Sequence, residues 1–276
     1  MLLQHAHAAH LQAAYEALVS EPGNPLEAEG ITIGETRVFA TNQNRLENRV
    51  LLTGNETTDE LDRIFEYFDQ RRVKAFIELN PANFLRTRPF SWQSELVGHL
   101  VNRGCHIDAF RCVLYLSGGP DTVPRPRIER YDHTRFDEFS TTVDAVYPPD
   151  TAAEADWARR TQRGPQWLHY VGLEAERPVS TGTLFVGEQL GYLAWWYTNP
   201  GFRSHGHQTA GIRARAADAF LLGCEGVFTV ADFDTQSSIN LQRAGFRLAY
   251  NYLLLTRDPT LPREVIADRS TEERER

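Results

Sequence analysis

The stretch Gly191-Tyr-Leu-Ala-Trp-Trp-Tyr-Thr-Asn-Pro-Gly-Phe-Arg-Ser-His-Gly206 decides how the rest of this 276-residue chain is interpreted. It begins as an apolar, aromatic run typical of a buried strand. Asn199-Pro200-Gly201 ends that run, because proline removes a backbone donor and glycine tolerates a positive φ. An alanine-rich segment from Thr209 to Leu222 then predicts a helix that Gly223 ends. A second apolar strand follows at residues 226–231, and this order predicts a right-handed parallel crossover unit.

The turn before the helix is Arg203-Ser204-His205-Gly206-His207-Gln208. It presents unpaired backbone N–H groups at a helix N-terminus, where the helix dipole also favours an anion. Gly206 has no Cβ, so a ligand can approach the backbone closely. Arg203, Arg213 and Arg215 are expected to add positive charge. The turn therefore predicts a phosphate site, with an ordinary strand–helix connection as the alternative.

These residues resemble the acyl-CoA signature of the GNAT superfamily of N-acyltransferases, Gln/Arg-x-x-Gly-x-Gly/Ala. The resemblance continues to Gly245-Phe246, where the last helix of the family ends, and it is specific over residues 166–257. One departure is Gln208, which occupies a position where the family has glycine or alanine. The resemblance implies an α/β fold built on a mixed sheet.

The first half of the chain also alternates strands and helices, and it resembles the degenerate first copy of tandem family members. Asn80-Pro81-Ala82-Asn83 stands where a phosphate turn would fall, and its proline has no N–H to donate. We therefore expect two tandem GNAT-like domains, each a twisted mixed sheet flanked by helices. The expected divisions are 1–118 for the degenerate domain, 119–126 for a linker, 127–260 for the catalytic domain and 261–276 for a charged tail.

The resemblance implies acetyl-CoA as the co-substrate, with its pyrophosphate on the turn and its pantetheine arm beside the fourth strand. Trp195 and Trp196 are expected to point to opposite faces of that strand. Two residues of the last helix, Ser238 and Asn240, either donate to the arm or cap that helix. The expected donor-binding residues are Trp196, Tyr197, Thr198, Arg203, Ser204, His205, Gly206, His207, Gln208, Ser238 and Asn240.

The catalytic acid is where the sequence departs most from the family. Leu241 occupies the position of the tyrosine that commonly protonates the departing CoA thiolate. Tyr252 and Tyr197 are the candidate catalytic residues in its place. His205, His207, Glu174 and Asp232 are further titratable candidates, and each has a structural alternative.

The function that this pattern predicts is transfer of an acetyl group from acetyl-CoA to a primary amine of a small molecule, by direct attack in a ternary complex. One alternative is a catalytically inactive acyl-CoA-binding protein with a regulatory or interaction role, which Leu241 favours. Another is a module that binds a different phosphate ligand at the turn, which Gly245-Phe246 disfavours.

Composition and charge limit the classes of partner and the compartment that we expect for this chain. A net charge of −8 argues against nucleic acid or an anionic membrane. No apolar run approaches the ~20 residues that span a bilayer. The three cysteines cannot all pair and favour a reducing cytoplasm. We expect a cytoplasmic monomer or homodimer.

Three histidines, His5, His7 and His10, fall in a predicted helix from Leu2 to Val19. A metal site there is disfavoured against a solvated helix face, because no cysteine or carboxylate joins them. No metal cofactor is predicted.

Overall fold

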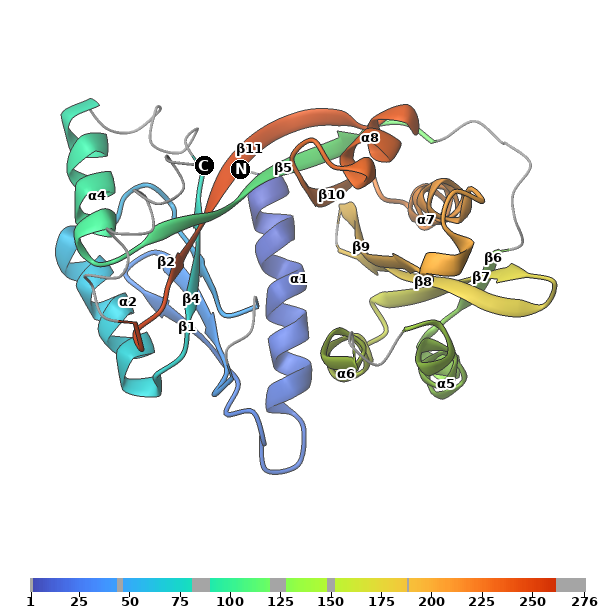
Figure 1. Ribbon diagram of the computed structural model, residues 1–276, viewed down its shortest axis with the longest axis horizontal. Coiled ribbons are helices and arrows are strands. Elements are labelled where there is room, and N and C mark those ends of the chain that lie inside the picture. The colour runs from blue at the N-terminus through green and yellow to red at the C-terminus, as the bar shows by residue number, and fades with distance from the viewer. Residues whose placement is uncertain are drawn as a thin grey trace. The chain divides into compact units, whose positions relative to one another are not determined.

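The computed structural model describes residues 2–43, 47–80, 90–119, 128–147, 152–187 and 189–261 (Figure 1). Its contacts divide the chain into two compact units. Unit 1 comprises Met1–Leu18 and Cys112–Ala249, and unit 2 comprises Val19–Arg111 and Tyr250–Arg276. Two long strands, β5 (His106–Leu116) and β11 (Arg247–Arg257), contribute residues to both units.

The described residues of unit 2 form two helices, α2 (Thr58–Arg71) and α4 (Phe90–Asn102), and a small mixed sheet. Its strands are β1 (Glu29–Ile33), β2 (Thr36–Ala40), β3 (Arg49–Leu51), β4 (Ala75–Leu79) and part of β11, in that spatial order. The β3–β4 pair is parallel and the other neighbours are antiparallel. Helix α2 begins with a capping box between Thr57 and Glu60, and it buries Leu61, Ile64, Phe65 and Phe68 in the core of this unit.

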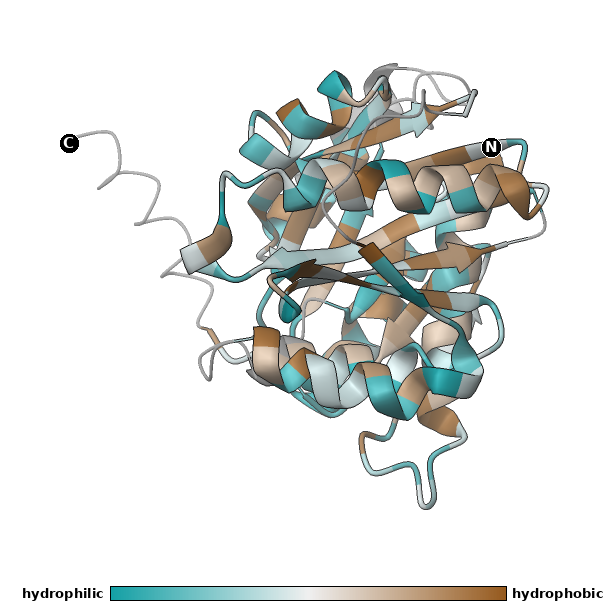
Figure 2. Cartoon of the chain, turned by 90° about the vertical axis from the view of Figure 1, so that its right-hand side faces the viewer, coloured by the Kyte–Doolittle hydropathy of each residue, from teal (hydrophilic) through white to brown (hydrophobic). Residues whose placement is uncertain are grey.

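Unit 1 holds the strands that flank the alanine-rich helix. Its sheet runs in the order β5-β10-β9-β8-β7-β6, with β9–β10 parallel and the strands from β9 to β6 antiparallel. Figure 2 shows hydrophobic residues along the strands, interrupted by hydrophilic ones, and helices that mix the two kinds of residue. The elements are β6 (Ile128–Tyr131), α5 (Phe136–Val146), α6 (Ala152–Thr161), β7 (Trp167–Glu174), β8 (Arg177–Val186), β9 (Leu190–Thr198), α7 (His207–Leu221), β10 (Gly226–Asp232) and α8 (Gln236–Arg243).

The first helix, α1 (Leu2–Val19), packs on the sheet of unit 1. The ring centroids of His10 and Tyr192 lie 4.2 Å apart, and Ala13 contacts the cluster that contains Phe185. The neighbouring Leu184 belongs to the cluster under α7 instead. Because adjacent residues of a strand point to opposite faces, α1 and α7 cover opposite faces of this sheet.

This arrangement differs from the expected domain division. The contacts of residues 1–18 are with 112–249, because α1 covers aromatic side chains of β8 and β9, and residues 250–276 fall with unit 2. Most of the expected linker, 120–126, and of the expected tail, 262–276, lies outside the described residues.

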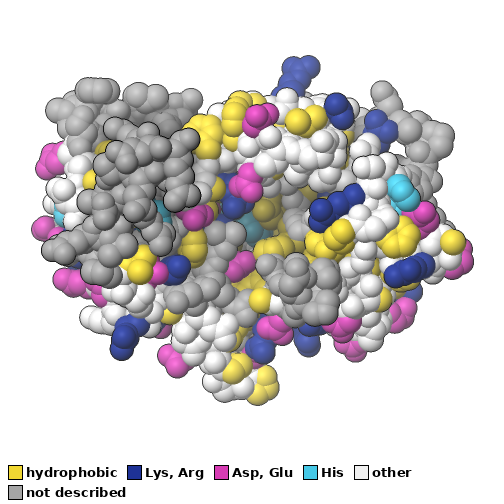
Figure 3. Space-filling model, in the orientation of Figure 1, with side chains coloured by type: hydrophobic (Ala, Val, Ile, Leu, Met, Phe, Trp, Pro, Cys, Tyr) yellow, Lys and Arg dark blue, Asp and Glu magenta, His cyan; other side chains and the backbone are white. Residues whose placement is uncertain are grey.

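On the face shown in Figure 3, acidic and basic side chains are interspersed. No helix within the described ranges has the length and apolar character needed to cross a membrane.

Candidate functional site

Strands β9 and β10 pair only at their beginnings. Residues 190–192 of β9 lie opposite residues 226–228 of β10, after which no further pair is registered between these two strands. The Thr229 hydroxyl still donates to the Leu193 carbonyl at 2.8 Å, but β9 runs on to Thr198 and β10 to Asp232. The two parallel strands therefore diverge, and the later part of β9 has backbone groups on this side that β10 does not use.

A β-bulge lies in the same part of β9. Thr181 of β8 is opposite Tyr197 and Thr183 is opposite Ala194, so β9 contains one extra residue. Within the bulge, Trp195 has a φ of 53°. A left-handed conformation is unfavourable for a bulky residue, so neighbouring groups must hold it in place.

Arg215 of α7 stabilises the backbone conformation of this bulge. Its guanidinium donates through Nη1 to the carbonyls of Thr183 and Ala194, both at 2.9 Å. The side chain is buried at 2% exposure, and burial lowers its pKa to about 9, which leaves it charged at neutral pH. The expectation that Arg215 adds charge for a phosphate is therefore wrong, because its donors are directed to the bulge.

The indole of Trp196 fixes how closely α7 approaches the sheet. A Cβ on Gly182 of β8 would come within 2.3 Å of this ring, and one on Gly211 of α7 within 2.1 Å. Trp196 packs with the cluster under α7, whereas Trp195 packs with the cluster under α1. The two indoles thus occupy opposite faces, as the strand alternation predicts.

The turn between β9 and α7 leaves its donors exposed. Ser204 and Gly206 have φ values of 68° and 85°, and Gly206 is an N-cap without a side-chain hydrogen bond. By contrast, α2 and α8 both begin with capping boxes. The first helical bond of α7 joins the Ala210 N–H to the Gly206 carbonyl, so the preceding N–H groups are available to an anion.

No protein-family model and no curated protein matches the sequence. Solved structures match its architecture. A GCN5-related N-acetyltransferase from Kribbella flavida aligns with 91% of this chain and 95% of its own, at 16% identity and a TM-score of 0.58. One from Sphaerobacter thermophilus aligns with 84% of this chain and 83% of its own, at 14% identity and a TM-score of 0.58. The chain has the GNAT fold.

The likeness is not confined to one unit. A tandem GNAT protein from the clavulanic acid biosynthesis pathway, solved without AcCoA, aligns with 82% of this chain and 79% of its own, at 13% identity and a TM-score of 0.54. That share of the chain is more than either unit contains. The expected mixed α/β fold of GNAT type is therefore confirmed.

Within this GNAT fold, a histidine–carboxylate cluster adjoins the turn. Oε2 of Glu174, at the end of β7, lies 2.9 Å from Nδ1 of His205 and 3.0 Å from Nε2 of His207. Hydrogen bonds from His207 and then His205 lower the pKa of the Glu174 carboxyl. Each residue is a candidate from the sequence alone, but only the fold brings the three together.

The polar residues of α8 are already used within the GNAT fold. Ser238 is buried, and its hydroxyl takes part in the capping box with Thr235, which matches the capping alternative. Asn240 donates to Oε1 of Gln208 at 2.7 Å, so the unusual sixth residue of the signature ties α7 to α8. Leu241 is 4% exposed and packs in the core.

The remaining predicted residues differ in accessibility. Arg203, Ser204, His205 and Gly206 are exposed, and Thr198 accepts a hydrogen bond from the Trp196 indole at 3.1 Å. Of the two candidate acids, Tyr197 is half-buried on the diverging part of β9, where its ring stacks on Tyr147 at 4.4 Å. Tyr252 is buried and belongs to unit 2 by its contacts.

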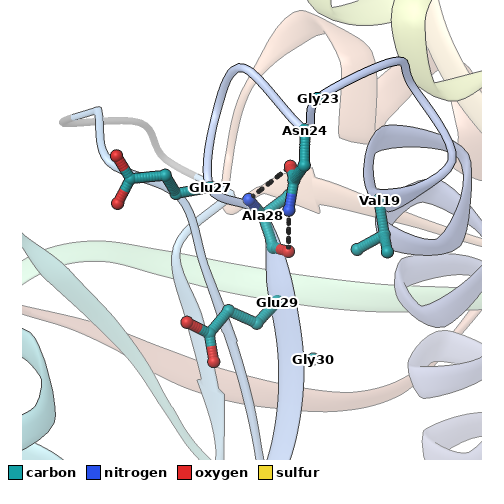
Figure 4. A pocket seen from close by; sticks show the side chains of 7 residues that line it. All are labelled: Val19, Gly23, Asn24, Glu27, Ala28, Glu29 and Gly30. Atoms are coloured by element: carbon teal, nitrogen blue, oxygen red, sulfur yellow. Dashed lines mark hydrogen bonds between the residues drawn. The ribbon is translucent and has the colours of Figure 1, made fainter.

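A separate pocket of about 630 Å³ lies in unit 2 (Figure 4). The Asn24 side-chain amide donates to the Ala28 carbonyl and accepts from the Ala28 N–H, so this polar side chain stabilises the conformation of its own loop. None of the predicted site residues lines the pocket, whose lining is Val19, Gly23, Asn24, Glu27, Ala28, Glu29 and Gly30.

Proposed function

We propose that this protein is an N-acyltransferase that moves an acetyl group from acetyl-CoA to a primary amine of a small molecule. One observation carries the proposal: β9 and β10 diverge beside a turn whose helix has no side-chain cap. The first feature leaves backbone groups for a pantetheine arm, and the second leaves N–H groups for a pyrophosphate. The GNAT fold supports the same assignment.

The reaction would proceed by direct attack. A neutral amine nitrogen forms a bond to the thioester carbon, and the carbonyl oxygen takes negative charge that a backbone N–H of β9 stabilises. Collapse of this tetrahedral intermediate breaks the C–S bond, and the amine loses one proton to solvent. Holding the two reactants together can supply about 7–11 kcal/mol of the barrier, so strong acid–base groups are not essential.

Tyr197 is the side chain we propose for protonating the departing thiolate, with Tyr252 as the second candidate. Tyr197 is favoured because it lies beyond the point of divergence and is accessible to solvent in part. A general acid contributes about 10²–10⁴-fold to a rate. Single-turnover transfer by Tyr197→Phe and Tyr252→Phe therefore identifies the acid, and rates within about threefold of wild type for both would leave solvent as the proton source.

The donor site is tested by two matched glycine variants. Gly206 and Gly223 lie at opposite ends of α7, both have positive φ, and a Cβ on either meets nothing within 4 Å. Gly206→Asp places a carboxylate where the pyrophosphate is proposed to bind, whereas Gly223→Asp imposes the same backbone strain and charge at the other end. Calorimetry with acetyl-CoA should give one site per chain and at least a tenfold weaker affinity, about 1.4 kcal/mol, for Gly206→Asp alone.

Equal affinities for the two variants would contradict this placement of the pyrophosphate. Two donor sites per chain would contradict the expectation that the first half of the chain is a degenerate copy. No binding to the wild-type protein at millimolar acetyl-CoA would contradict the function itself.

A second candidate is acyl-CoA binding without turnover. The specific observation in its favour is the buried Leu241 in place of a family tyrosine. Donor binding combined with no CoA release in the presence of amino acids, polyamines, amino sugars or peptides would support it. Acetylated product from any of these amines would exclude it.

A further inference from the structure

Glu174, His205 and His207 converge more closely than an ordinary ion pair requires. Their ligand atoms all lie within 4.8 Å of one another, and among the described residues this is the one group of three metal-ligating side chains with that property. The three side chains come from two elements, since Glu174 ends β7 and the histidines flank Gly206 at the start of α7. Glu174 is distant in the sequence from the two histidines, so it is the packing of β7 beside the start of α7 that brings them together.

From this geometry we propose that Glu174, His205 and His207 bind one divalent transition-metal ion, with Zn²⁺ as the expected occupant. Two imidazole nitrogens and one carboxylate oxygen suit Zn²⁺ or its neighbours, whereas Mg²⁺ and Ca²⁺ prefer oxygen ligands alone. Three protein ligands also leave a coordination position for water or another small ligand.

The burial of the three side chains fits one fixed ligand and two adjustable ones. The side chain of His207 is 2% exposed, whereas those of His205 and Glu174 are 50% and 40% exposed. The carboxylate oxygen now lies 2.9 and 3.0 Å from the two ring nitrogens. Ligands of a tetrahedral Zn²⁺ with bonds of ~2.0–2.1 Å are separated by about 3.3 Å. The two carboxylate–nitrogen distances are close to this value, and the two ring nitrogens, which lie within 4.8 Å of each other, would reach it by movement of the exposed His205 side chain.

A second observation points to the same site. Nδ1 of His207 is buried without a hydrogen-bond partner among the described residues, and so is the hydroxyl of Ser180. Both atoms face Gly172, where an added Cβ would lie 3.2 Å from Nδ1 of His207 and 2.2 Å from Oγ of Ser180.

The proton on His207 connects these two observations. When Nε2 donates to Glu174, Nδ1 is a buried lone pair, and the hydroxyl of Ser180 forms no hydrogen bond to it. When Nε2 binds a metal ion, the proton moves to Nδ1, which becomes a donor on the side where the Ser180 oxygen lies. Metal-bound histidines commonly donate their second N–H to such an oxygen. Metal binding would thus make Nδ1 a donor on the side of Ser180, and a small shift of either side chain would then pair the two buried atoms.

The experiment uses the full-length protein without a histidine tag, stripped with a chelator and then titrated with Zn²⁺ by calorimetry. Co²⁺ serves as a spectroscopic probe, because a site with few ligands absorbs visible light far more strongly than the hydrated ion. We expect one ion per chain. His205→Gln and Glu174→Gln should each weaken Zn²⁺ binding at least tenfold and abolish the Co²⁺ band. Both side chains are solvent-exposed in part, so their replacement preserves the fold.

Two variants serve as controls. Glu176→Gln removes a carboxylate from the same hairpin, and His133→Gln removes an exposed histidine elsewhere in unit 1. Both should bind Zn²⁺ like wild type. The proposal is overturned if the wild type binds no Zn²⁺, or if its ion is retained with unchanged affinity by His205→Gln and Glu174→Gln. An ion lost on replacing His5, His7 and His10 instead would also overturn it. None of these readouts involves acetyl-CoA, so the result is independent of the proposed function.

Discussion

His169 gives unit 1 a defined sensitivity to acid. This side chain of β7 is 0% exposed, and its ring stacks on Phe139 at a centroid distance of 4.4 Å. Burial lowers the pKa of His169 from 6.5 to about 4. Between these two values the unfolded chain takes up a proton that the folded chain does not. Stability is therefore complete above pH 6.5 and falls as the pH is lowered through this window.

The size of the effect follows from the same values. With a pKa of 6.5 in the unfolded chain and about 4 in the folded protein, His169 lowers the free energy of unfolding by about 3 kcal/mol at pH 4. At pH 5 about 2 kcal/mol of this is already lost. His169→Leu replaces the imidazole with an apolar side chain of similar volume and removes the titration. A difference in packing energy between the variant and wild type does not vary with pH, whereas the pH dependence of the variant's stability should be weaker by these amounts.

Urea unfolding between pH 7.5 and 5 measures this difference. The wild-type free energy of unfolding should fall about 2 kcal/mol more than that of His169→Leu over this range. His133→Leu, which removes an exposed histidine, should keep the wild-type pH dependence. Parallel curves for His169→Leu and wild type, within about 0.5 kcal/mol, would refute the reasoning, since uptake of a proton by His169 would then not be linked to unfolding.

Two further predictions concern α7 and the strand beneath it. Gly211→Ala should destabilise the protein by about 1–3 kcal/mol in thermal melts, because the added Cβ would clash with Trp196. Gly98→Ala lies in a helix and its Cβ would meet open space, so this variant should stabilise the protein by about 1 kcal/mol. Arg215→Met should weaken acetyl-CoA binding at least fivefold, because the bulge in β9 loses its two charged hydrogen bonds. Arg247→Met, which removes an exposed arginine of β11, should bind the donor like wild type. Equal donor affinities for the two arginine variants would show that the bulge holds its shape without Arg215.

The crossover unit could be predicted from the sequence because its signals are local. The helix expected from the turn to Leu222 is found at His207–Leu221, and Gly206 has the positive φ that only its lack of a Cβ makes easy. Ser238 was expected either to cap the last helix or to donate to the arm, and the structure places its hydroxyl in a capping box with Thr235. Each of these depends on residues within one or two helical turns.

The parts that could not be predicted depend on distant contacts. The charge of Arg215 suggests a side chain that contacts solvent or a phosphate. Its contacts are instead the carbonyls of Thr183 in β8 and Ala194 in β9, beside the bulge. Glu174 lies some thirty residues before the histidines that it contacts. Helical periodicity identifies a buried face on α1, yet it does not say that this face covers Phe185 and Tyr192. Spacing along the chain does not encode these partners.

The position of α1 has a consequence for how the protein is made. This helix is synthesised well before the strands that it covers, because Tyr192, whose ring contacts that of His10, follows all of residues 19–111. At ~5–20 residues per second the helix waits about 10–40 s for the strands that it covers. An isolated helix of this length is marginal in water. Unit 1 therefore completes its core late in synthesis, and until then α1 must not pack stably against other parts of the chain.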